Sequence, residues 1–212
     1  ATSDAGAQAI TTRMASVGGV GKVLDVTDSA AVEAVIEDIG KSIGPISVLV
    51  NNAGITRDQI LMRMKDEDWN LILDTNLSSV YRTSKAVMRG MMKARKGRII
   101  NIASRAAYRG DSPQHWHYAA SKAGMVAMTK TIARGYAREN ILAFAICPGF
   151  TMTGMADEYL ASRGGDKLLA DIPLGRVAMP EEVAEMVAFC ALKAPPSMTG
   201  SVLDINGASY VR

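Results

Sequence analysis

Short runs of valine, isoleucine and leucine alternate along the chain with longer segments whose apolar residues recur every three or four positions. The short runs are typical of strands buried on both faces, and the longer segments are typical of helices that cover such strands. Strands are predicted at residues 22–26, 46–51, 98–104, 141–147 and 201–206. Helices are predicted at residues 29–43, 66–95, 118–138 and 180–192. The alternation predicts an open, mostly parallel α/β sheet with helices on both sides.

Capping residues, glycines and prolines separate the predicted elements. Asp28 and Ser29 can cap the helix that follows them, and Gly44 with Pro45 ends that helix before the next strand. The sequence has no internal repeat, low-complexity tract or linker, which favours one domain over residues 1–212. Residues 150–180 are less regular, since glycine and proline interrupt short helical pieces. An irregular segment beside strand ends is typical of a substrate lid.

Composition narrows the class of protein further. Of 212 residues, 48% are hydrophobic and 21% are charged, which indicates a globular domain with a substantial core. No apolar run approaches the roughly 20 residues that cross a bilayer, and residues 1–30 lack a secretory signal, so a cytoplasmic protein without a membrane partner is expected. The net charge of +3 is too small to imply a nucleic-acid partner. Cys147 and Cys190 lie in apolar runs and are expected to be reduced core thiols.

One stretch of the chain is strongly basic. Its basic residues, with no acid among them, are Arg82, Lys85, Arg89, Lys93, Arg95, Lys96 and Arg98. Apolar residues such as Val80 and Val87 recur at helical spacing in the same stretch, so most of the charges are expected on the opposite helix face. The simplest interpretation is a solvated surface.

The ends of the predicted strands carry candidate chemistry. Ser104 closes the third strand, and Tyr118 and Lys122 begin the helix that follows. A tyrosine and a lysine at i and i+4 share a helix face, where the ammonium favours the phenolate and lowers the tyrosine pKa from its reference of about 10. Such a phenol can protonate the oxygen of a carbonyl that accepts hydride, while a serine hydroxyl hydrogen-bonds that oxygen. The pair alone is a weak signal, because ordinary amphipathic turns contain both residues.

The pair belongs to an ordered set of motifs. These are NNAG at 51–54, TNLSSVYRTSKAV at 75–87, IINIAS at 99–104, YAASKAG at 118–124, PGFTMT at 148–153 and TGSVLDINGA at 199–208. In this order and combination they resemble the short-chain dehydrogenase/reductase family over nearly the whole chain. The resemblance implies a Rossmann-like doubly wound parallel sheet and hydride transfer with a nicotinamide cofactor.

The resemblance also implies catalytic roles, position by position. Tyr118 matches the general acid/base, and Lys122 matches the lysine that lowers the tyrosine pKa and binds the nicotinamide ribose. Ser104 matches the serine that orients the substrate. Asn76 matches the asparagine that anchors a water in the proton relay. No metal site is implied.

Further positions match the family's cofactor contacts. They are Asp25 and Val26 beside the adenine, Asn51, Ala53 and Gly54 beside the adenosine ribose, and Pro148, Gly149, Thr151 and Thr153 in the loop that meets the carboxamide. Tyr118 and Lys122 complete this set. The resemblance favours NADPH as the cofactor, with NAD as the alternative.

Residues 48–100 resemble most closely the bacterial 3-oxoacyl-[acyl-carrier-protein] reductases. This likeness implies a 3-oxoacyl thioester substrate in fatty acid biosynthesis, and an acidic carrier protein docked on the basic stretch Arg82 to Arg98, with Arg95 the best candidate. It also implies a homotetramer built through the long helices and the C-terminal strand. Its interface would include Met88, Met91, Met125 and Met128.

The sequence from Ser104 onward is less like those reductases, which leaves two alternatives open. One is a short-chain alcohol dehydrogenase acting on another ketone or secondary alcohol, favoured by the unusual loop at 105–117. The other is a catalytically silent dinucleotide-fold binding protein. The joint presence of Ser104, Asn76, Tyr118 and Lys122 argues against the silent protein.

The glycine-rich motif that opens the family's fold is not in this sequence. In the family, a strand, a glycine-rich turn and a helix hold the cofactor pyrophosphate. The GGVG at residues 18–21 precedes a predicted strand instead of a helix. We therefore expect the active polypeptide to carry a further N-terminal βαβ unit.

The loop before Tyr118 contains several residues of uncertain role. His115 and His117 alternate with no further histidine in the chain, which makes a poor metal site. His115, Trp116 and Tyr108 are expected to form either a wall of the substrate pocket or a packed loop. Arg105 and Arg109 are expected either to meet an anionic substrate group or to lie on the surface.

Overall fold

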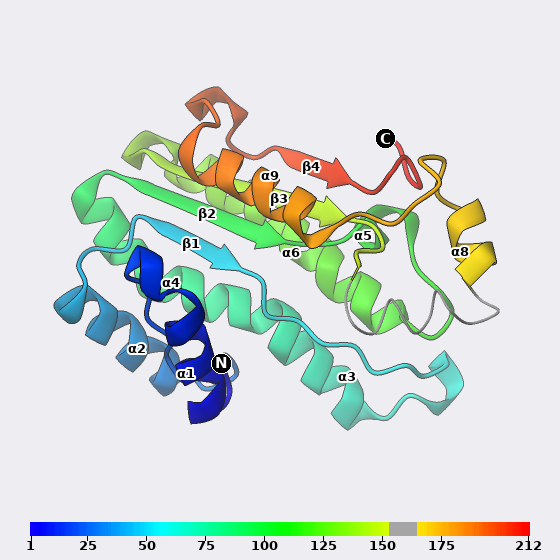
Figure 1. Cartoon of the computed structure of the whole chain (residues 1–212), viewed down its shortest axis with the longest axis horizontal. Coiled ribbons are helices and arrows are strands. Elements are labelled where there is room, and N and C mark those ends of the chain that lie inside the picture. Colours follow the sequence, from blue (N-terminus) through cyan, green and yellow to red (C-terminus); the bar gives the residue numbers. More distant parts are fainter. Residues whose placement is uncertain (153–164) are drawn as a thin grey trace.

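Four parallel strands form a single sheet in the computed structural model, which describes residues 1–152 and 165–212. The strands are β1 (Val48–Asn51), β2 (Gly97–Ile102), β3 (Ile141–Pro148) and β4 (Val202–Ile205). Their order across the sheet is β1-β2-β3-β4, and every neighbouring pair is parallel (Figure 1). The parallel α/β sheet predicted from the sequence is confirmed.

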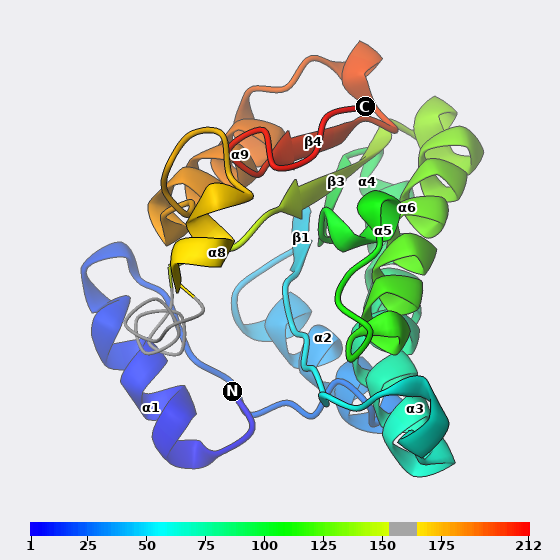
Figure 2. The ribbon, with the colours of Figure 1, turned by 90° about the vertical axis from the view of Figure 1, so that its right-hand side faces the viewer.

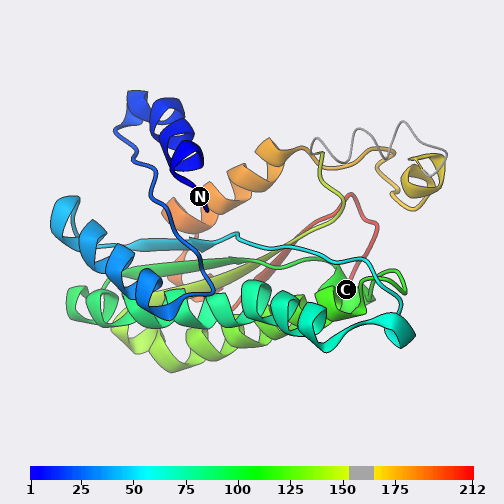
Figure 3. The ribbon, with the colours of Figure 1, turned by 90° about the horizontal axis from the view of Figure 1, so that it is seen from below.

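Helices cover both faces of this sheet. The helices of the described residues are α1 (Asp4–Arg13), α2 (Ser29–Ser42), α3 (Asp66–Leu73), α4 (Ser79–Ala94), α5 (Ala106–Arg109), α6 (Trp116–Tyr136), α8 (Gly165–Ala170) and α9 (Pro180–Leu192). Helices α4 and α6 lie against one face, and α9 lies against the other (Figure 3). Within the described parts of the chain, no helix combines the length and apolar character that a membrane crossing requires.

Strand β3 is the centre of the core, and its first seven residues are buried. Alternate side chains point to opposite faces of a strand, so its residues divide between the two helical layers. Ile141 and Ala143 pack with Val87 of α4 and Ile132 of α6. On the other face, Leu142, Phe144 and Ile146 pack with α9. This continuous apolar run is what a strand covered on both faces requires.

The predicted helix at 66–95 is interrupted by one wider turn. Residues Asp74–Ser78 form a π-helical segment that joins α3 to α4 without a break in the helix. A π turn inserts one extra residue, and such turns are frequent at functional sites. Here the turn carries Asn76, whose side chain is fully buried.

The predicted strand at 22–26 is wrong. Backbone hydrogen bonds join this segment to Ala1, from the Leu24 amide to the Ala1 carbonyl at 2.7 Å and from the Ala1 amine to Lys22 at 3.1 Å. None of the described strands pairs with the segment. An apolar run becomes a strand only when a neighbouring strand completes its hydrogen bonds, and the run itself does not specify that neighbour.

The predicted subunit interface is wrong for two of its four methionines. Met91 and Met125 are fully buried within the single chain. They fill the layers between the sheet and helices α4 and α6, where flexible thioethers suit irregular gaps. Met88 and Met128 are half-buried against the same layers.

The part of segment 150–180 that the structure describes is tied to the end of β3. Thr151 forms an isolated parallel bridge with Ala178, and the Met152 amide donates to the Ala178 carbonyl at 2.8 Å. Helix α8 lies beyond the carboxyl ends of the strands, onto which Figure 2 looks. Thr153 lies outside the described residues. That this segment acts as a lid stays a prediction.

Candidate active site

The start of α6 lies beside the carboxyl end of the sheet, onto which Figure 2 looks. Three predicted catalytic side chains come together there. Lys122 donates from Nζ to the carbonyl of Ile102, the last residue of β2, at 2.7 Å. The same nitrogen lies 5.6 Å from the centre of the Tyr118 ring. The Ser104 hydroxyl, two residues beyond β2, lies close enough to the Tyr118 phenol to lower its pKa. A hydroxyl, a phenol and an ammonium therefore share one site.

Asn76 joins the loop after β1 to α6. Its Oδ1 accepts from the Ile55 amide at 2.8 Å, and its Nδ2 donates to the Ile55 carbonyl at 2.9 Å. The same Nδ2 donates to the Ser121 hydroxyl at 3.3 Å, and Ser121 in turn donates to the Tyr118 carbonyl at 2.7 Å. Sequence reasoning missed Ser121, although its position three residues after Tyr118, on the same helix face, was a signal.

Burial dominates the proton affinities of the site. Desolvation raises the pKa of Tyr118, and the nearby Ser104 hydroxyl lowers it by a smaller amount. Desolvation also lowers the pKa of Lys122 to about 8. The pKa of Tyr118 thus lies above its reference and not below it as the sequence predicted, because the cost of burying a phenolate exceeds the favourable contact with Ser104.

Cys147 of β3 is a neutral thiol beside these groups. It is fully buried, and desolvation raises its pKa to about 11. Both cysteines are free and buried, which confirms that they lie in the core; that they are reduced stays a prediction. A protonated, buried thiol is a poor nucleophile, so Cys147 contributes packing rather than chemistry.

A buried ladder of polar side chains supports the strand ends from behind. Asn51 donates to Asn101 at 2.8 Å, and Asn101 donates to Thr129 at 2.8 Å. Thr83 donates to Asn51 at 2.7 Å. The side chain of Asn51, predicted beside the adenosine ribose, is thus directed into the interior and holds β1, β2, α4 and α6 together.

The residues present fit a nicotinamide cofactor at the open end of the sheet. The buried Lys122 ammonium has three donors and one hydrogen bond to the described residues, which leaves donors for ribose hydroxyls. Gly54 and Ala53 are exposed beside it. A Cβ on Gly54 would make ordinary contacts, 3.4 Å from Lys122 Nζ and 3.5 Å from Asn76 Oδ1, so Gly54 directly borders both catalytic side chains.

The other predicted cofactor positions are less closely gathered. Pro148 and Gly149 lie at the end of β3, where the Gly149 amide donates to Ile205 at 2.8 Å, and Thr151 follows in the bridge to Ala178. Asp25 and Val26 lie in the turn before α2, and Asp25 accepts from the Thr27 amide at 2.9 Å. In the described residues, no hydrogen bond joins Asp25 or Val26 to the Ser104 site.

The loop at 105–117 is packed at its two ends, whereas residues 109–114 between them are exposed. Trp116 stacks on Trp69 with ring centres 5.0 Å apart, and Tyr108 stacks on Tyr210 at 6.1 Å. His117 is fully buried, and desolvation lowers its pKa. The packed-loop interpretation therefore accounts for the aromatic residues.

Both arginines of this loop bind one carboxylate. Arg109 donates from Nη2 to Asp171 at 2.9 Å, and Arg105 Nη1 lies 3.5 Å from the same carboxylate. Asp171 directly follows α8, so these ion pairs connect the loop to the described part of segment 150–180. Sequence reasoning missed Asp171, because a contact between residues 62 positions apart has no local pattern.

The basic stretch divides between structural and exposed residues. Arg82 bonds to Asp74 at 2.5 Å, and Arg98 donates to the carbonyls of Cys190 and Ala194 at 2.6 and 2.9 Å. Arg95 ends α4 in a left-handed conformation and donates to the Arg138 carbonyl at 2.6 Å. The remaining basic residues, Lys85, Arg89, Lys93 and Lys96, are exposed.

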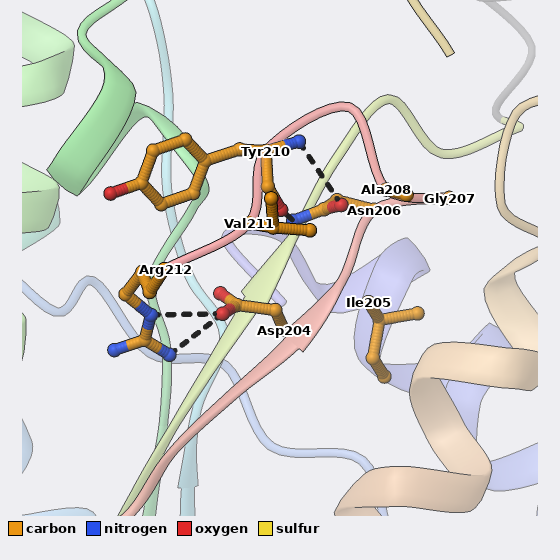
Figure 4. A pocket seen from close by; sticks show the side chains of 8 residues that line it. All are labelled: Asp204, Ile205, Asn206, Gly207, Ala208, Tyr210, Val211 and Arg212. Atoms are coloured by element: carbon orange, nitrogen blue, oxygen red, sulfur yellow. Dashed lines mark hydrogen bonds and ion pairs between the residues drawn. The ribbon is translucent and has the colours of Figure 1, made fainter. Parts of the chain in front are cut away.

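A separate pocket of 660 Å³ lies at the C-terminus (Figure 4). It is lined by Asp204, Ile205, Asn206, Gly207, Ala208, Tyr210, Val211 and Arg212. An ion pair between Arg212 and Asp204 at 2.7 Å and a hydrogen bond from Asn206 to the Tyr210 carbonyl at 3.0 Å fold this tail on itself. None of the Ser104, Tyr118 and Lys122 side chains lines the pocket, so it is distinct from the catalytic site.

Comparison with known proteins places this site in a family. A family model described as enoyl-(acyl carrier protein) reductase matches residues 1–208. The chain is 47% identical over 211 residues to the 3-oxoacyl-[acyl-carrier-protein] reductase FabG of Escherichia coli (strain K12), covering 100% of this chain and 85% of that protein. The FabG proteins of Vibrio harveyi and Pseudomonas aeruginosa are 44% and 45% identical over the same shares of each chain. The chain belongs to the short-chain dehydrogenase/reductase family of oxidoreductases.

Proposed function

We propose that the protein is an NADPH-dependent reductase of 3-oxoacyl thioesters in fatty acid biosynthesis. The observation that carries the proposal is the grouping of Ser104, Tyr118 and Lys122 at the end of β2, with Asn76 alongside. The names of relatives at 44 to 47% identity support the substrate class.

The side chains divide the work of ketone reduction. A reduced nicotinamide, held by Lys122 and the end of the sheet, would supply the hydride that the carbonyl carbon accepts. Tyr118 transfers its phenolic proton to the carbonyl oxygen, so that the ketone becomes a secondary alcohol. Ser104 donates a hydrogen bond to the oxygen while negative charge develops on it. Lys122 holds a positive charge near the phenol and favours the phenolate that remains, which solvent then reprotonates.

Asn76 has a positioning role in this proposal. The Asn76 side chain hydrogen-bonds both the backbone N–H and the backbone carbonyl of Ile55. The same side chain donates to the Ser121 hydroxyl on α6. The loop after β1 and the helix that carries Tyr118 and Lys122 are thereby held in one geometry. A water bound at this amide would connect Lys122 to solvent.

Turnover assays test the proposal directly. NADPH oxidation is followed with acetoacetyl thioesters of coenzyme A and of carrier protein, and with a panel of small and cyclic ketones. Thioester-dependent oxidation is the expected result. Turnover confined to the simple ketones would instead support the second candidate, an alcohol dehydrogenase acting on another ketone; the packing of the Trp116 and Tyr108 rings at the two ends of the loop at 105–117 is the observation that favours it.

The exposed basic residues offer a docking surface for an acidic carrier protein. Lys85, Arg89 and Lys93 project from α4 into solvent, whereas Arg82 and Arg98 are held by internal contacts. Arg95 also donates one hydrogen bond to the Arg138 carbonyl. Complementary charge raises association rates and depends on salt, so high salt should weaken turnover of the carrier-protein thioester more than that of the coenzyme A thioester.

The proposed assembly and location follow from the same family assignment. A homotetramer through α4, α6 and β4 uses the outer surfaces of these elements, since Met91 and Met125 are core residues. The two buried free thiols suit the reducing cytoplasm. A binding protein without catalytic activity is disfavoured by the convergence of the catalytic groups.

NADPH affinity is expected to fall as the pH rises above 8. Lys122 has a pKa of about 8 in the free protein, so it loses its proton above that pH. The ribose hydroxyls accept hydrogen bonds from the Lys122 ammonium, so Lys122 must be protonated when NADPH binds. At each pH unit above the Lys122 pKa, this protonation lowers the NADPH affinity by about a factor of ten. Fluorescence titration of NADPH between pH 6.5 and 10 measures the effect. Lys122→Arg stays charged and should give a flat profile; a flat profile for the unmodified protein would contradict the prediction.

A further inference from the structure

His115 joins two loops at the mouth of the site. Its Nε2 is hydrogen-bonded to the Asp58 carboxylate at 2.8 Å, and its Nδ1 lies 3.6 Å from Asp111. Asp58 belongs to the loop after β1, and Asp111 to the loop after α5. The Gln59 amide also donates to the Gln114 carbonyl at 3.1 Å, so backbone and side chain hold the two loops together.

The same histidine is in contact with the proposed acid. Its ring centre lies 6.5 Å from that of Tyr118, with the planes inclined at 64°, an edge-to-face arrangement. His115 directly precedes α6, and its carbonyl accepts the Ala119 amide at 2.9 Å as the helix begins. Its side chain is 26% exposed, so the imidazole is packed but reachable from the site.

The charged groups around His115 lie close enough to affect the phenol. Asp58 and Asp111 face the imidazole, and His117 follows it on α6. Asp111 is also among the groups that raise the pKa of Tyr118. Movement of this loop would therefore change both the position of the phenol and its environment.

We propose that His115, clasped by Asp58 and Asp111, is a positioning residue that fixes the Tyr118 ring for proton transfer. The inference goes beyond the proposed function by adding a residue of the loop at 105–117, and its kinetic test rests on that function. The clasp ties the start of α6 to the loop that Asn76 holds from the other side. Tyr118 is thus held by Ser121 and Asn76 on one side and by His115 on the other.

Steady-state kinetics with NADPH and acetoacetyl thioester test the clasp. His115→Ala and Asp58→Ala should each lower kcat by about tenfold with KM changed less than twofold, because misplacement of an acid slows the chemical step. His115→Gln retains a donor near Nε2 and should recover most of kcat. Gln114→Ala, an exposed neighbour whose side chain has no hydrogen bond to the described residues, is the matched control.

Three kinetic results would overturn the proposal. They are an unchanged kcat in His115→Ala, a His115→Gln variant as slow as His115→Ala, and an equal loss in Gln114→Ala. Thermal melting of every variant accompanies the kinetics. If His115→Ala and His115→Gln both melt at a lower temperature than the wild-type protein and both turn over slowly, the role of His115 is purely structural.

A titration of Tyr118 tests the clasp without turnover. Phenolate absorbance is measured against pH, and the curve of the Tyr118→Phe variant is subtracted. His115→Ala should lower the Tyr118 pKa, because water reaches a ring that the imidazole had covered, whereas Gln114→Ala should leave it unchanged. An unshifted pKa in His115→Ala would overturn the proposal. A wild-type protein inactive on every thioester would instead remove the proposed function, and this titration would still decide the role of His115.

Discussion

Replacement of Tyr118 by phenylalanine is expected to lower kcat for ketone reduction by roughly 10²- to 10⁴-fold, the usual contribution of a general acid. The phenol is the proton donor in the proposed reaction, and phenylalanine retains the ring while removing the proton. Cofactor affinity should change little, since Lys122 keeps its bond to the Ile102 carbonyl at 2.7 Å. NADPH oxidation and NADPH fluorescence titration on the same preparation measure the two effects.

Tyr108→Phe is the matched control for this substitution. The Tyr108 hydroxyl is buried without a hydrogen-bond partner among the described residues, and its ring stacks on Tyr210. Loss of that hydroxyl should leave kcat within about twofold, in keeping with the small effect of removing an unpaired polar atom. Comparable activity in Tyr118→Phe and the wild-type protein would remove Tyr118 from the mechanism.

Replacement of Asn76 by alanine is expected to destabilise the fold by about 2 to 6 kcal/mol, from about 1 to 3 kcal/mol for each backbone group of Ile55 left without its partner. Asn76 is fully buried whereas Ile55 is half-buried, so water can replace part of these bonds and the lower half of this range is expected. Activity should fall as well, because the loop after β1 loses its link to α6. Urea denaturation followed by circular dichroism gives the free energy of unfolding.

Two further variants make the result specific. Asn76→Asp keeps the acceptor for the Ile55 amide but loses the donor to its carbonyl and to Ser121, and should lie between alanine and the wild-type protein. Asn52→Ala removes an exposed amide of the same loop and should change stability by less than about 0.5 kcal/mol. Wild-type stability of Asn76→Ala would show that the Ile55 groups are satisfied without the asparagine.

Much of the fold was predictable because its signals are local. The buried strand at 141–148 reads as a continuous apolar run, and Asp28 caps α2 by accepting from the amides of Ala30 and Ala31. The failed strand at 22–26 carries the same local signal. Strand formation depends on a neighbour, and the identity of that neighbour is a long-range property.

The site was predictable to the extent that its residues share one helix or follow ordered motifs. Tyr118 and Lys122 are four positions apart, so their proximity follows from helix geometry. The clasp between His115 and Asp58 spans 57 positions, and no periodicity links the two residues. The inward direction of Asn51 was equally hidden, because its partner Asn101 lies 50 positions away on another strand.

The π turn at Asp74–Ser78 sets the rotation of α3 relative to α4 about their common helix axis. Each residue advances an α-helix by about 100°, so removing one residue from this turn would rotate α3 relative to α4 by that angle. Trp69 before the turn stacks on Trp116, and Val87 after it packs with Ile132, so both halves are bound to α6 in register. A single deletion in this turn is therefore expected to separate one half of the helix from α6 and to withdraw Asn76 from Ile55 in the same step.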